Sequence, residues 1–113
     1  MASVSMSGRG NVDQVAGMLE GEIQNSGFSC TLVDRVQRTV GTGKVIVMVF
    51  EKYFMRASNR ASLTVMVSGE DEAVCVDAIG SGGGQGAIFK FSWGAEESFV
   101  GTVEKILARQ GFM

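Results

Sequence analysis

The sequence predicts an α+β fold of two layers, with an N-terminal helix, a five-stranded antiparallel sheet connected as a meander, and a C-terminal helix. Near both ends of the chain, apolar residues recur every three or four positions, which is typical of amphipathic helices. Between these ends they alternate with polar residues, which is typical of strands separated by short turns. The 113 residues, 45% of them hydrophobic, suffice for one core.

Residues 1–10 are rich in serine and glycine and are predicted to form a flexible N-terminal arm, whereas residues 11–113 are predicted to form a single α+β domain. The N-terminal helix is expected to start after Asn11, a favourable N-cap, with Gln14 at capping-box spacing. Gly27 is a typical left-handed stop for it. Its apolar face consists of Val12, Val15, Ala16, Leu19 and Ile23.

The first predicted strand, residues 28–40, alternates between apolar and polar positions. Val36 and Val40 have the parity of its buried side. Asp34 and Arg38 break that parity, and either a β-bulge near Val33 or fraying of the far end of the strand would explain the break.

Three further strands and a short fifth one follow. Residues 44–55 are apolar on both faces, so this strand is expected in the middle of a sheet that is covered on both sides. Residues 61–68 and 73–79 alternate more clearly, and an acidic turn joins them. A glycine-rich run, residues 80–86, leads into the fifth predicted strand, residues 87–91.

The C-terminal helix is expected to begin at Ser92 or Gly94 and to end at Gly111. Its apolar stripe consists of Phe99, Val103, Ile106 and Leu107.

If both helices cover the same face of the sheet, the other face is open and partly apolar, as interfaces and ligand grooves often are. A homodimer through this face or through a sheet edge is the first hypothesis. A monomer with one helix on each face, or a ligand cavity between sheet and helices, is the alternative. The candidate interface residues are Met48, Met66 and Cys75.

Composition excludes several kinds of chemistry. The chain has no histidine and only two cysteines, which rules out His-based catalytic pairs and a four-cysteine zinc site. A net charge of −2 gives no general attraction to nucleic acid or anionic membranes. No signal-like segment is evident at the N-terminus, so the protein is expected in the cytoplasm with Cys30 and Cys75 reduced. No metal, cofactor, nucleic-acid or membrane partner is predicted.

Two segments could bind a small anionic ligand. Residues 56–60 contain two arginines whose guanidinium groups could converge on a phosphate or carboxylate, although a simple connecting loop is the favoured explanation. Residues 80–86 could present backbone amides, but they lead into a strand-like segment and not into a helix, unlike a phosphate-binding loop. The candidate ligand-binding residues are Arg56, Ser58, Asn59, Arg60, Gly82, Gly83 and Gly84.

Two other features receive structural interpretations. Phe89 and Phe91 flank Lys90 as in base-stacking surfaces, but the acidic composition favours core packing. Asp77, an acid within a strand, is expected to pair with a cation such as Lys90 or Arg56. No catalytic residue is assigned, and an enzyme is the remaining alternative.

The segments 50–63, 78–84 and 91–99 resemble a family of small bacterial cytosolic proteins of unknown function. This resemblance implies a bacterial source and a stand-alone domain, and it transfers no activity. The leading hypothesis is a non-enzymatic protein that self-associates and can bind a small anionic ligand. The alternative is a protein–protein adaptor that uses the open sheet face.

Overall fold

The computed structural model describes residues 2–26, 29–54, 59–82 and 89–113. The predicted α+β class, with two helices and a five-stranded antiparallel sheet, is confirmed. The elements, in chain order, are β1 (Ala2–Arg9), α1 (Val12–Gln24), β2 (Cys30–Val40), β3 (Gly43–Phe54), β4 (Asn59–Glu70), β5 (Ala73–Gly82) and α2 (Phe89–Arg109).

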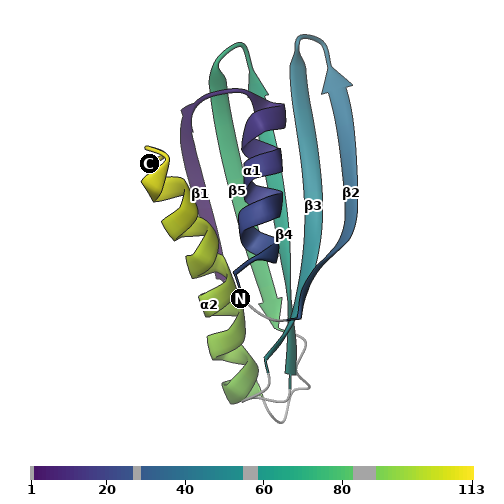
Figure 1. Ribbon diagram of the computed structural model, residues 1–113, viewed down its shortest axis with the longest axis vertical. Coiled ribbons are helices and arrows are strands. Elements are labelled where there is room, and N and C mark those ends of the chain that lie inside the picture. Colours follow the sequence, from purple (N-terminus) through teal and green to yellow (C-terminus); the bar gives the residue numbers. More distant parts are fainter. Residues whose placement is uncertain (1, 27–28, 55–58, 83–88) are drawn as a thin grey trace.

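The sheet has the order β1-β5-β4-β3-β2, and every neighbouring pair is antiparallel (Figure 1). Strands β2 to β5 form the predicted meander. The fifth strand is β1, which pairs with β5 from Ala2 opposite Gly80 to Arg9 opposite Ala73. The two edge strands of the sheet are therefore β1, at the start of the chain, and β2.

The prediction of a flexible arm at residues 1–10 is wrong, because Ala2–Arg9 is the edge strand β1. Buried and exposed side chains alternate along β1 with a period of two residues, although most of these side chains are small. Ala2 is buried and Val4 and Met6 are half-buried, whereas the serines between them are exposed. Serine is compatible with the solvated face of a strand, so the composition of the segment was misleading.

The strand predicted at residues 87–91 is also wrong for the part that the structure describes, since α2 begins at Phe89. Residues 87 and 88 lie outside the described residues. A short run of alternating apolar residues does not distinguish a strand from the first turn of a helix. The C-terminal helix therefore starts earlier than Ser92 or Gly94.

The predicted bulge near Val33 is confirmed, and it changes which side chains of β2 are buried. Leu32 lies opposite Phe50, but Asp34 lies opposite Val49, so the register shifts by one residue at Val33. A shift of one residue moves every later side chain to the other face. The assignment of Val36 and Val40 to the buried side is therefore wrong, and they are 51% and 68% exposed.

Both helices cover the same face of the sheet, so the molecule has the two predicted layers (Figure 1). α1 packs on β2, β3 and β4, whereas α2 packs on β1, β5 and β4. The core lies between the helices and this covered face. Its largest fully buried side chains are Phe50, Phe99, Leu19, Ile23, Ile46, Met48, Leu63 and Leu107.

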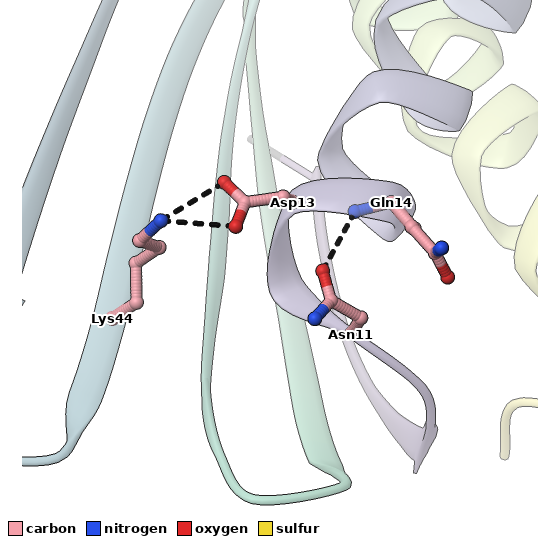
Figure 2. A network of polar contacts seen from close by, with 4 residues as sticks. All are labelled: Asn11, Asp13, Gln14 and Lys44. Carbon is pink, nitrogen blue, oxygen red and sulfur yellow. Dashed lines mark hydrogen bonds and ion pairs between the residues drawn. The ribbon is translucent and has the colours of Figure 1, made fainter.

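The start of α1 is fixed by the N-cap that the sequence predicts. The side chain of Asn11 accepts a hydrogen bond of 3.2 Å from the backbone N–H of Gln14. Asp13 in the first turn binds the Lys44 ammonium group at 2.9 Å, which ties the helix to β3 (Figure 2). This end of α1 is therefore stabilised by a side-chain N-cap and by an ion pair to the sheet.

The chain after α2 turns back onto the sheet. Gly111 has a φ of +89°, the left-handed conformation expected of a helix stop. Phe112 is buried against β1, where its ring occupies the space beside Gly8. Met113 and Ser7 exchange two backbone hydrogen bonds of 3.0 Å each. The C-terminal residues thus close part of the outer edge of β1.

Candidate functional site

The face of the sheet opposite the helices, here called the open face, is not covered by any element of the described chain (Figure 1). The expectation that β3 is covered on both sides therefore holds for only one side. One row of side chains crosses all five strands on the open face. It runs Ser5, Asp77, Met66, Val47 and Val36, from β1 to β2.

The apolar side chains of the open face are unevenly distributed. Those of β2 are the most exposed, with Val36 at 51% and Val40 at 68%, and Val33 at the bulge is 56% exposed. The β3 valines beside them are half-buried. On the other side of the face, β1 contributes only serines and an arginine. The most exposed apolar side chains therefore lie on β2, and Ile79 of β5, 47% exposed, is a further one toward the β1 side.

The three predicted interface residues lie on different faces. Met66 on β4 is 37% exposed and Cys75 on β5 is exposed, and both are on the open face. Met48 is fully buried under the helices, so its assignment to an exposed interface is wrong. β3 is apolar on both faces, and its pattern therefore gives no sign of which face the helices cover.

The two cysteines are free thiols on opposite faces of the sheet. Burial raises the pKa of the Cys30 thiol, and the Lys52 charge and a side-chain hydrogen bond with Ser26 oppose this effect. A thiol with a raised pKa is less reactive at neutral pH. Cys75 is therefore the accessible thiol of the pair.

Asp77 lies on the open face within β5. Its carboxylate accepts a hydrogen bond of 2.6 Å from the Ser5 hydroxyl on the neighbouring strand. Of the predicted cationic partners, Arg56 and the side chain of Lys90 lie outside the described part of the chain. The described contact is a polar cross-strand pair typical of sheets.

Part of the predicted ligand site comes together at one end of the sheet. Arg60 follows Asn59 at the start of β4, and the next residue, Ala61, lies opposite Gly82 of β5. These positions are therefore adjacent, as the hypothesis requires. Its other members, Arg56, Ser58, Gly83 and Gly84, lie outside the described residues.

A cavity of about 320 Å³ lies beside Arg60. The Arg60 guanidinium is 3.7 Å from the Glu51 carboxylate, and both side chains are largely solvent-exposed. The Lys52 ammonium lies 5.7 Å from the centre of the Phe99 ring. Hydroxyl groups and two cations are suitable donors for an anion, although Glu51 offsets part of the positive charge. The lining residues are Ser29, Thr31, Glu51, Lys52, Tyr53 and Arg60.

A second cavity, of about 540 Å³, lies between the end of α1 and α2. Lys105 and Arg109 line one side, and the Arg109 guanidinium is 3.4 Å from the carboxylate of Glu22. Within the described residues, no group of three or more side chains of the metal-binding types is close enough to hold a metal ion. In the same part of the chain, neither helix combines the length and the apolar character needed to cross a bilayer.

The feature that the sequence did not reveal is the exposed outer edge of β2. Val36 and Val40 point to the open face only because of the bulge at Val33. The available signal is the parity break at Asp34, because a bulge at that point reverses the orientation of the valines after it. Three of the exposed large apolar side chains of the described residues, Val33, Val36 and Val40, lie on this strand.

Comparison with known proteins identifies a family. The family model of DUF6054, a family of unknown function, matches residues 1–111, so the chain belongs to this family. Neither the curated proteins nor the solved structures contain a significant match to the chain. Any functional conclusion therefore depends on the geometry described above.

Proposed function

We propose that this member of family DUF6054 is a non-enzymatic protein of the bacterial cytosol that self-associates through the β2 side of its sheet. The observation that carries the proposal is the group of valines on β2, each more than half exposed, on a strand whose outer edge has no partner among the described residues. Apolar surface of this kind gains free energy when a second apolar surface covers it.

The arrangement of the acidic side chains supports a binding role over an enzymatic one. General acid–base catalysis needs a carboxyl group that is free to exchange a proton within a pocket. Glu22 and Glu51, the acids that line the two cavities described above, each lie beside an arginine. Ion pairs at such exposed positions are ordinary surface features.

The mass of the assembly tests the proposal. Native mass spectrometry and sedimentation across the micromolar range should show a dimer that dissociates on dilution. A lysine in place of Val36 should shift the population to monomer, whereas Gln24→Lys, on the exposed side of α1, should leave the dimer intact. A wild-type protein that stays monomeric at every concentration would remove self-association as its function.

A second candidate function is the binding of a small anion at the cavity beside Arg60. The observation in its favour is that Arg60, selected from the sequence, lies next to Gly82 in the register and lines a cavity with three hydroxyl-bearing residues. Inorganic phosphate should raise the thermal midpoint of the wild-type protein and not that of Arg60→Ala. Arg9→Ala, a similarly exposed arginine at the other end of the sheet, is the control. Equal stabilisation of all three proteins would contradict an anion site at Arg60.

A further inference from the structure

The outer edge of β2 presents backbone groups in a defined alternation. Gly41 and Thr42 form a two-residue turn, with a φ of +60° at Gly41, so Val40 and Gly43 close the hairpin as a hydrogen-bonded pair. In an antiparallel ladder such pairs alternate with non-hydrogen-bonded ones. Val36 and Arg38 therefore direct their N–H and C=O groups toward β3. The intervening residues, Arg35, Gln37 and Thr39, direct theirs outward to the free edge.

We propose that two copies of this chain pair antiparallel through β2, with Val36 of one copy opposite Val36 of the other. This inference rests on the proposed self-association and names its geometry. In this register Arg35 of one copy meets Gln37 of the second, so the outward-directed backbone groups face one another and can form the ladder hydrogen bonds. The product is one continuous sheet made of two five-stranded halves, with both open faces on the same side.

Charge complementarity selects this register. Asp34 and Arg38 are exposed on the open face, two residues either side of Val36. With Val36 at the symmetry axis, Asp34 of each copy lies opposite Arg38 of the other. These are non-hydrogen-bonded positions, where the side chains of facing residues approach most closely. Because the two copies are related by a two-fold axis, the pair between Asp34 and Arg38 forms twice.

The neighbouring registers that the backbone allows lack this match. Moving the axis by one residue places Asp34 or Arg38 opposite a valine of the second copy. Moving it by two residues places Asp34 opposite Asp34, or Arg38 opposite Arg38, and like charges at facing positions are destabilising. Only the Val36-centred register pairs opposite charges on both sides of the axis.

The same register joins the apolar surfaces of the two copies. Val36 lies opposite Val47 of β3 within its own chain, and across the axis it meets its symmetry mate. A valine row therefore continues from one copy into the next without a charged residue between them. Edge strands of soluble proteins are usually protected from such pairing, and charges are one means of protection. Here the charges are arranged so that they favour one pairing partner, a second copy.

Cysteine cross-linking tests the register directly. In a Cys75→Ser background, Val36→Cys should form a disulfide-linked dimer on mild oxidation, because facing residues of a non-hydrogen-bonded pair meet the Cα separation of a disulfide. Val40→Cys is the matched control. It is the more exposed position, at 68%, but the register places it opposite Leu32 of the second copy. Equal cross-linking of both variants, or none by Val36→Cys in a protein that is dimeric by mass, would overturn this geometry.

A charge exchange provides the second test. Arg38→Asp should raise the dissociation constant of the dimer by about tenfold, since it places two pairs of like charges across the axis. Asp34→Arg should weaken the dimer similarly, although Asp34 also accepts a hydrogen bond of 2.7 Å from the backbone N–H of Arg35. The double exchange should restore the wild-type dissociation constant.

The outcomes distinguish a failure of the β2 register from a failure of the proposed self-association. A dimer insensitive to both single exchanges would refute the β2 register and leave self-association standing. A monomeric wild-type protein would refute both. A double exchange that stays as weak as the single variants would show that these charges do not face each other.

Discussion

The two edges of the sheet differ in how far other parts of the chain cover them. At β1, backbone hydrogen bonds between Ser7 and Met113 occupy part of the edge, and the buried Phe112 ring anchors the C-terminal residues. At β2, the described chain places nothing along the outer edge, and three exposed valines lie on that strand. One edge is partly covered by the chain's own C-terminal residues, and the other is left uncovered by the described residues.

The difference shows how a small sheet can limit its own pairing. An uncovered edge is a template for any extended chain, so a domain with two free edges could assemble without end. The proposed pairing of β2 with β2 uses the same edge of both copies and therefore gives a closed dimer, and the partly closed β1 edge disfavours further addition. The C-terminal residues and the bulge in β2 thus have different effects: the former occupy part of the β1 edge, and the latter turns the valines that follow it to the open face.

The largest effect should follow from removing the anchor of the β1 edge. Phe112 is 4% exposed, and replacing a buried phenylalanine by alanine removes its packing and leaves a cavity. Phe112→Ala should lower the free energy of unfolding by about 3 kcal/mol in urea denaturation. Met113→Ala, at a side chain that is 91% exposed, keeps the same backbone bonds and should change it very little. Equal stabilities of the two variants would contradict the anchoring role of Phe112.

A smaller effect on stability is expected at Gly8, where β1 contacts the Phe112 ring. A Cβ atom at Gly8 would lie 2.8 Å from the Phe112 ring, which is too close for either group to remain in place. Gly8→Ala should therefore cost about 1–3 kcal/mol, the usual range for overpacking. Gly17→Ala in α1 is the matched control. A Cβ atom there meets nothing within 4 Å, so this variant should be more stable by up to about 1 kcal/mol. Destabilisation by Gly17→Ala, or none by Gly8→Ala, would show that the packing beside β1 is misplaced.

Much of the fold could be predicted because its elements carry local patterns. The cap at Asn11, the stop at Gly111 and the bulge at Val33 all depend on residues that are neighbours in sequence. β1 could not be recognised by composition, because its serines face solvent and its partner, β5, is about seventy residues away in the chain. Tertiary pairing, and not local propensity, makes this segment a strand.

The site was harder to predict because the exposure of a strand side chain depends on which face of the sheet the helices cover. Met48 and Val47 are equally apolar neighbours on β3, yet the first is in the core and the second faces the open side. On β2, a single inserted residue reverses the orientation of Val36. Arg60 lies at the start of β4, an end of a strand that its turn residues locate whichever face is covered, and its role in anion binding stays a prediction.

The smallest effect concerns the ion pairs that attach the edge strands to the rest of the molecule. On β2, the Arg35 guanidinium donates to the Glu20 carboxylate of α1, and both side chains are about 30% exposed. Arg9 of β1 and Glu72 are 3.4 Å apart, and their side chains are 86% and 80% exposed. Arg35→Ala should destabilise the monomer by about 1 kcal/mol, since partial burial limits screening and the aliphatic stem also packs. Arg9→Ala should have no measurable effect.

Hydrogen exchange at low protein concentration shows which part of the monomer is destabilised by Arg35→Ala. In Arg35→Ala, the amides of β2 that bond to β3 should exchange faster, while those of β1 paired with β5 should keep their wild-type rates. Such a result would mean that β2 is held on one side only, by its ladder to β3 and a side-chain link to α1. If Arg35→Ala and Arg9→Ala behaved alike, the attachment of the two edges would be equivalent, and the greater availability of β2 would have to come from its valines alone.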